Sequence, residues 1–139
     1  MKPIRACASV AIIAVLAACA TKPKEPPPKP FAGTRWEVQL QVPLAGEKPW
    51  VRFGDGLLEG FGGCNRIEGR YVQDSVGARA IAIGRIETGR HACDRSAQLV
   101  EDRWLEVLQM ASSYSITANV MSMTGSAGTL VLRADEEKK

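Results

Sequence analysis

The stretch 94–111 reads DRSAQLVEDRWLEVLQMA, and its apolar residues recur at the spacing of an amphipathic helix. Asp94 is a typical N-cap residue, because its side-chain oxygen can accept a hydrogen bond from the first helical turn. The acidic pair Glu101 and Asp102 is expected on the solvent-facing side. The interior face is predicted to carry Ala97, Val100, Trp104, Val107, Leu108 and Ala111, and the solvent face Gln98, Asp102, Arg103, Glu106 and Gln109.

Short strands are expected on both sides of this helix. Residues 35–42 alternate between apolar and polar, which is the period of a half-buried strand, and they place Trp36, Val38, Leu40 and Val42 on one face. Turn residues separate the other apolar runs at hairpin spacing, so the sheet is expected to be antiparallel. Those runs are 50–53, 57–61, 67–73 and 80–86 before the helix, and 114–117, 120–124 and 129–133 after it.

This order of elements predicts an α+β fold. Five strands, one helix and three strands favour a strongly curved antiparallel sheet or incomplete barrel of about eight strands, packed on one amphipathic helix at 94–111. Closing the sheet in this way limits the number of exposed strand edges.

The N-terminus has the parts of a bacterial lipoprotein export signal. Lys2 and Arg5 precede an apolar run at 6–18, which is shorter than the roughly 20 residues that span a bilayer. Leu16-Ala17-Ala18-Cys19 resembles a lipobox. By that resemblance, residues 1–18 are a signal peptide and Cys19 becomes the lipidated first residue of the mature protein. The alternative is an ordinary signal peptide with an incidental cysteine.

Acyl chains on Cys19 would anchor the protein in a membrane of the bacterial envelope. Ala20 follows the cysteine, and resemblance to enteric lipoproteins then favours the outer membrane, with the domain facing the periplasm. Residues 19–32 are rich in proline and are expected to form an extended linker. The folded domain is expected at 33–134, followed by a charged tail at 135–139.

The distribution of charge along the sequence limits the kinds of partner that are expected. The formal net charge is +3, but the excess of lysine and arginine lies in the first 30 residues, so the remainder is close to neutral. A nucleic-acid-binding domain concentrates positive charge on its folded part, and nucleic acid is therefore not an expected partner. The expected partners are the membrane, through the acyl chains, and an envelope protein or lipid. A monomer is expected.

Cys64 and Cys93 are the cysteines left after the signal and the anchor are assigned. A pair of cysteines in an oxidising compartment favours a disulfide. Two free buried thiols are one alternative. Zinc is another, but the two cysteines and His91 supply three ligands where a structural site takes four. No metal or other cofactor is expected.

No arrangement of residues predicts catalysis. His91 is the single histidine, and neither Ser96 nor Ser126 lies in a nucleophile-elbow setting. The amide of Asn65 is expected to bind backbone in its turn, and the alternative is a contact with a partner. A candidate partner patch beside the two cysteines consists of Asn65, Arg66, Arg90 and His91.

Three segments together resemble the META domain, the family of HslJ-type heat-inducible envelope proteins. They are Gly33-Thr34-Arg35-Trp36, the run from Gly63 to Tyr71 (GCNRIEGRY), and Thr88-Gly89-Arg90-His91-Ala92-Cys93, with Glu101, Trp104 and Leu108 in the helix. His91 departs from the pattern, which usually has Met there. The resemblance implies a small α+β envelope domain with roles suggested in heat or antibiotic tolerance, secretion or motility, and it brings no catalytic residues.

The leading hypothesis is therefore a non-enzymatic, lipid-anchored envelope protein that acts by binding in envelope integrity or stress tolerance. One alternative is an inhibitor of a foreign hydrolase such as lysozyme, which would insert the turn at 62–66 into the enzyme's cleft. A second alternative is a pilot-like binder of a secretion partner or lipid, as in the related fold of secretin pilots. That function requires an apolar cavity between helix and sheet.

Overall fold

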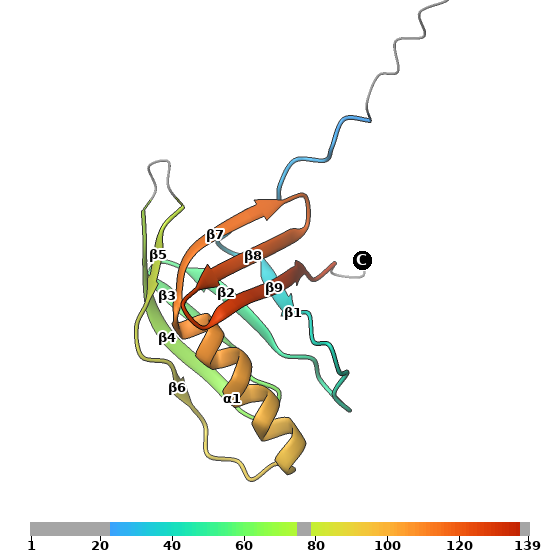
Figure 1. Ribbon diagram of the computed structural model, residues 1–139, viewed down its shortest axis with the longest axis vertical. Helices are drawn as coiled ribbons and strands as arrows, with labels where there is room; N and C mark the ends of the chain where they lie inside the picture. The colour runs from blue at the N-terminus through green and yellow to red at the C-terminus, as the bar shows by residue number, and fades with distance from the viewer. Residues whose placement is uncertain (1–22, 75–78, 137–139) are drawn as a thin grey trace, which may run out of the picture.

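The computed structural model describes residues 23–74 and 79–136, which form a curled antiparallel sheet and one helix (Figure 1). The expected signal peptide, Cys19, part of the turn at 74–77 and the end of the charged tail lie outside the described residues. The strands are β1 (Arg35–Val38), β2 (Trp50–Gly54), β3 (Leu57–Phe61), β4 (Arg66–Gln73), β5 (Ile81–Ile83), β6 (Glu87–Thr88), β7 (Ala111–Thr117), β8 (Val120–Gly125) and β9 (Gly128–Ala134), and the helix is α1 (Arg95–Gln109).

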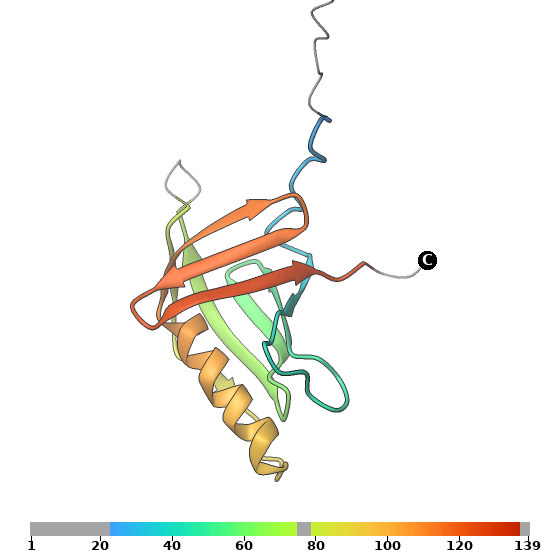
Figure 2. The same ribbon diagram turned by 45° about the vertical axis from the view of Figure 1, so that its right-hand side comes forward.

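The strands lie in the order β5-β4-β3-β2-β1-β9-β8-β7, and the short β6 pairs with β4. The two halves of the chain join where β1 pairs with β9, in the register Trp36↔Ala134. The sheet then nearly closes on itself, because Ala80 bridges Ser113 and the backbone N–H of Tyr114 donates to Arg79 O at 3.1 Å. Figure 2 shows β7–β9 on one side and β2–β4 on the other. The predicted α+β fold with a curved sheet is confirmed.

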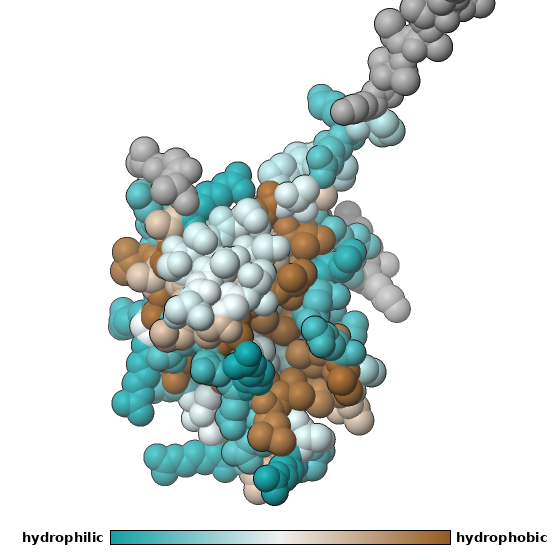
Figure 3. Space-filling model, in the orientation of Figure 1, coloured by the Kyte–Doolittle hydropathy of each residue, from teal (hydrophilic) through white to brown (hydrophobic). Residues whose placement is uncertain are grey.

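The core lies inside the curled sheet and against α1. Its fully buried side chains come from both halves of the chain and include Trp36, Phe53, Leu58, Met121 and Leu132. The outward face of β7–β9 carries mainly hydroxyl side chains, and it forms the pale, neutral area of Figure 3. Alternation along each strand therefore separates a dry interior from a polar exterior, as period-two sequence requires.

Phe31 belongs to the packed domain, although it falls in the segment expected to be linker. Its ring stacks on Phe53 with centroids 4.5 Å apart and meets Tyr114 at 4.6 Å. Its carbonyl accepts from Trp36 Nε1 at 3.1 Å. The ordered packing thus begins before residue 33, because an aromatic ring among prolines gains more by burial than by exposure.

The helix α1 begins where it was predicted. Asp94 Oδ1 accepts from the backbone N–H of Ala97 at 2.8 Å, and the hydroxyl of Ser96 also bonds this carboxylate. These hydrogen bonds lower the pKa of Asp94, the Ser96 hydroxyl contributing most. The prediction for Glu101 is wrong, because its side chain is buried, with an exposed fraction of 3%. No helix among the described residues is long and apolar enough to cross a bilayer.

Three predicted strands and the predicted end of the helix differ from the observed ones. The helix was expected to reach residue 111 and the next strand to begin at 114, but α1 ends at Gln109 and β7 begins at Ala111. The first strand ends at Val38, whose N–H donates to Pro49 O at 2.9 Å. Proline has no N–H to continue the ladder, so the chain leaves the sheet and Val42 is 70% exposed instead of buried. The predicted strand at 80–86 is also too long. The chain forms only β5 there and returns to β4 as β6, in the register Ile67↔Thr88.

Candidate functional site

The turn at residues 62–66 joins β3 to the first residue of β4, and its backbone is held by several contacts. Its ends are joined by a hydrogen bond from Gly62 N to Asn65 O at 2.7 Å. Gly63 has a φ of +109°, a conformation that side chains rarely adopt, so a glycine suits this position. Cys64 and Asn65 are both buried. The turn therefore directs its polar atoms into the molecule and needs partners there.

Glu101 of α1 supplies those partners. Its Oε2 accepts from the backbone N–H groups of Cys64 at 3.0 Å and Asn65 at 2.6 Å, and its Oε1 accepts from Asn65 Nδ2 at 3.1 Å. A buried carboxylate is costly unless such donors replace water. One turn further along α1, Trp104 Nε1 donates to Gly62 O at 2.7 Å. The helix thus binds the turn through two side chains.

A disulfide and a second loop complete this cluster. Cys64 and Cys93 are bonded, with their Cα atoms 5.8 Å apart, as the disulfide prediction required. Asn65 Oδ1 accepts from the backbone N–H of His91 at 2.7 Å, and Gly89 N donates to Arg66 O at 3.0 Å. We call residues 62–66, the loop 89–93 and Glu101 the disulfide cluster.

The structure divides the predicted partner patch into a buried and an exposed part. Asn65 has an exposed fraction of 5%, and its amide binds backbone as expected and also Glu101, which was not expected. Arg66, Arg90 and His91 are exposed. Their side chains make no ion pair or hydrogen bond with the rest of the described chain. A surface offered to a partner would therefore consist of these three side chains.

A pocket of about 460 Å³ opens beside the disulfide cluster, on the outward face of β2 and β3. Its aromatic wall is Trp50, which lies opposite Phe61 in the β2–β3 ladder. Trp50 is held by a hydrogen bond from its Nε1 to Glu47 Oε1 at 2.9 Å and by Arg35, whose Cζ lies 4.3 Å from the ring centroid. The lining residues are Glu47, Trp50, Gly60, Phe61, Cys64, Arg66, Gly89 and His91.

Sequence reasoning missed Glu101, Trp50 and Phe61 as parts of this site. A signal for Glu101 was present, because residues 101, 104, 105 and 108 share one face of a helix. A carboxylate on the same face as Trp104 and Leu108 has to be buried with its own donors. Nothing in the sequence indicated that Trp50 and Phe61 would line a pocket.

Comparison with known proteins places the chain in a family. Residues 29–138 match the family model of the META domain. The chain belongs to the META domain family. Among proteins of curated function, none matches it in sequence.

Two solved structures share the fold of this META domain. A protein from Burkholderia xenovorans, solved by NMR, is 18% identical and superimposes with a TM-score of 0.62 over 78% of this chain and 85% of its own. A DUF4847 family protein from Bacteroides vulgatus is 17% identical, with a TM-score of 0.55 over 78% of this chain and 96% of its own. At these identities the likeness concerns the fold alone.

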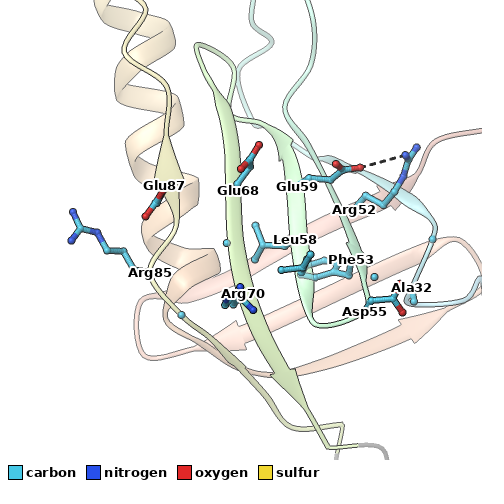
Figure 4. A pocket seen from close by; sticks show the side chains of 15 residues that line it. Ala32, Arg52, Phe53, Asp55, Leu58, Glu59, Glu68, Arg70, Arg85 and Glu87 are labelled. Carbon is cyan, nitrogen blue, oxygen red and sulfur yellow. Dashed lines mark ion pairs between the residues drawn. The ribbon is translucent and has the colours of Figure 1, made fainter.

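A second, larger hollow of this META domain lies on the outer side of β2–β4 and has a volume of about 1040 Å³ (Figure 4). Three glutamates stand opposite one another across its strands, in the registers Glu59↔Glu68 and Glu68↔Glu87. Glu59 also pairs with Arg52 at 3.7 Å. No group of three or more His, Cys, Asp or Glu side chains within the described ranges is arranged to hold a metal ion.

The alternative binding functions each depended on one structural feature. The turn at 62–66 does not project as an inhibitory loop would, because Gly62, Cys64 and Asn65 are buried. The space between α1 and the sheet is filled by Trp104, Leu105 and Leu108, none more than 8% exposed. Neither the insertion of that turn into a hydrolase cleft nor the pilot-like binding of a tail beneath α1 is favoured.

Proposed function

We propose that this META domain protein is a non-enzymatic, lipid-anchored protein of the bacterial envelope that acts by binding, in envelope integrity or stress tolerance. The observation that carries the proposal is the open pocket beside the disulfide cluster. There Arg66 and His91 present side chains without partners among the described residues, next to the aromatic pair Trp50 and Phe61. Family membership supports the assignment to the envelope.

The polar side chains of the site favour binding over catalysis. Both carboxylate oxygens of Glu101 already accept hydrogen bonds from the turn. The carboxylate of Asp94 caps α1. His91 has no acidic partner within the described chain to orient its imidazole, as general acid–base catalysis commonly requires. Two of these three groups, Glu101 and Asp94, are therefore engaged in structural hydrogen bonds, and the third, His91, lacks an orienting acid within the described chain.

Lipidation of Cys19 is the anchoring step of this proposal. The lipobox Leu16-Ala17-Ala18-Cys19 and the proline-rich linker support it. Palmitate labelling of cells that express the wild type and the Cys19→Ala variant tests it. The variant should incorporate no label and remain unprocessed, whereas label in the variant would contradict the lipobox assignment.

Deletion of the gene tests the physiological role. Loss of the protein should sensitise cells to heat, detergent or a hydrophobic antibiotic, and the wild-type gene should restore tolerance. The Cys19→Ala gene serves as the matched control, because it supplies the same domain without the acyl chains and should not restore tolerance. A deletion strain with wild-type tolerance across all three stresses would contradict the proposed role.

A further inference from the structure

We propose that the pocket beside the disulfide cluster binds a ring-shaped organic acid. In this assignment the ring of the ligand packs on Trp50 and Phe61, and its carboxylate is held by Arg66. The assignment names a ligand class for the binding function proposed above. It rests on that proposal for the location of the pocket in the bacterial envelope.

The shape of the pocket suits a ligand of one or two rings. Its volume of about 460 Å³ falls within the range of small-molecule pockets. Trp50 and Phe61 are half-buried and adjacent across the β2–β3 ladder, so they offer a continuous aromatic wall. Gly60 and Gly89 line the same space without side chains. Aromatic walls of this kind favour the flat faces of aromatic or sugar rings.

The charges around the pocket select an anion. Arg66 is the next residue in the same cross-strand row, opposite Phe61, and its exposed guanidinium has no partner within the described chain. The acid of the pocket, Glu47, is already engaged by Trp50 Nε1 at 2.9 Å and by Arg35 at 3.2 Å. Arg66 is therefore the charged side chain of the pocket lining that has no partner within the described chain. A guanidinium binds a carboxylate through two parallel hydrogen bonds, which makes a carboxylic acid the best-matched anion.

The wall that carries Arg66 and His91 is fixed before any ligand arrives. The Cys64–Cys93 bond, the three hydrogen bonds to Glu101 and the hydrogen bond from His91 N to Asn65 Oδ1 all hold it. Binding then orders few protein groups, which reduces its entropic cost.

The position of the pocket favours a ligand outside the anchoring bilayer. Lys29 N donates to Ala118 O at 2.7 Å, which joins the linker to the β7–β8 turn. Figure 1 shows the linker leaving one end of the domain and the N-terminus of α1, beside Cys93, at the other. The disulfide cluster, and the pocket beside it, therefore lie toward the end of the domain opposite the one from which the linker leaves. This arrangement favours a water-borne or polymer-borne acid over a headgroup of the same bilayer.

Two matched pairs of probes test the assignment on the full-length protein in a zwitterionic detergent. N-acetylmuramic acid differs from N-acetylglucosamine by a carboxylate-bearing side chain. Indole-3-acetic acid likewise differs from indole by a carboxylate-bearing side chain. At least one acid should bind saturably, about tenfold tighter than its neutral counterpart, and shift the backbone amide resonances of 60–66 and 89–91. The pair of probes in which the acid binds more tightly shows whether the ligand of the pocket carries a sugar ring or an aromatic ring.

Variants on one strand separate the site from general charge effects. Arg66→Gln should weaken binding of the acid about tenfold and leave the remaining amide spectrum in place. Arg70→Gln is the control, because Arg70 is exposed on the same face of β4 but lines the larger hollow instead. Failure of both acids to bind, equal binding of acid and neutral probe, or unchanged binding by Arg66→Gln would each overturn the assignment.

The outcome can be distinguished from failure of the proposed function. A stress-sensitive deletion strain combined with no binding of either acid would reject the ligand and leave the envelope role standing. Binding of an acid combined with a fully tolerant deletion strain would reject that role and leave the pocket assignment standing.

Discussion

The carboxylate of Glu101 binds both the backbone and the side chain of Asn65 from 36 residues away, with N···O distances of 2.6 Å and 3.1 Å. This pair joins the middle of α1 to the turn between β3 and β4. Because the same turn carries the disulfide and one wall of the pocket, the local geometry of the site depends on a contact that lies entirely in the interior.

Removal of the carboxylate should destabilise the domain strongly. Glu101→Ala leaves the buried backbone N–H groups of Cys64 and Asn65 without acceptors and removes the carboxylate acceptor of Asn65 Nδ2, which keeps only its contact with Cys64 Sγ. We expect a loss of about 3 to 5 kcal/mol in the free energy of unfolding, measured by urea denaturation. Asp102→Ala is the control, because Asp102 is exposed beside it and should change stability by less than about 0.5 kcal/mol. Equal, small effects of the two variants would mean that Glu101 is not a structural anchor.

A methyl group at Gly62 should disrupt the same contact. A Cβ built there would lie 2.1 Å from Glu101 Oε2, whereas one at Gly54 meets nothing within 4 Å. The Glu101 carboxylate cannot move aside without breaking its hydrogen bonds to the turn. We therefore expect Gly62→Ala to cost about 2 to 4 kcal/mol in urea denaturation and Gly54→Ala to be close to neutral. A neutral Gly62→Ala variant would contradict the close packing of helix and turn.

Reduction of the disulfide should lower stability while leaving the fold class unchanged. The bond joins residues 29 positions apart, and a loop of that length contributes about 3 to 4 kcal/mol in the chain-entropy model. The measurement compares the melting temperatures of oxidised protein and of protein reduced and alkylated. Peptide masses showing alkylated Cys64 and Cys93 in unreduced, denatured protein would instead establish free thiols.

Neutralising one of the three glutamates that line the larger hollow should stabilise the domain. Glu68 lies between Glu59 and Glu87 on neighbouring strands, and like charges directly opposite one another are destabilising. Glu68→Gln should raise the free energy of unfolding by about 0.5 kcal/mol at low salt, with a smaller gain at high salt. Glu59→Gln should gain less, because it also loses the pair with Arg52. A Glu68→Gln gain that is independent of salt would indicate another cause.

Local patterns in the sequence predicted most of the elements of this fold. The period of α1, its Asp94 cap and the hairpin spacing of the strands are short-range features, and each is visible within a few residues. The pairing of β1 with β9 and the near-closure of the sheet at Ala80 and Ser113 join distant parts of the chain. Local patterns do not specify such pairings. They indicated only that the exposed strand edges of the sheet had to be covered.

The site was predicted less completely, and one core residue outside it, Phe31, was misassigned. The cysteines and Asn65 belong to a recognisable run, so the disulfide and the turn could be expected. Glu101 was misplaced because a charged residue is normally exposed, and its burial depends on donors brought from a turn that is distant in the chain. Phe31 was assigned to the linker because it directly follows a proline-rich run, while its ring contacts are with Phe53, Tyr71 and Tyr114.

Amide hydrogen exchange at Asn65 tests the interior link between α1 and the disulfide cluster most directly. The Asn65 N–H is buried against Glu101 Oε2 at 2.6 Å, so it should exchange as slowly as the core strands in the wild type. In Glu101→Ala it should exchange much faster, while amides of β8, far from the turn, keep their protection relative to global unfolding. Fast exchange of the Asn65 amide in the wild-type protein would contradict a helix-anchored turn.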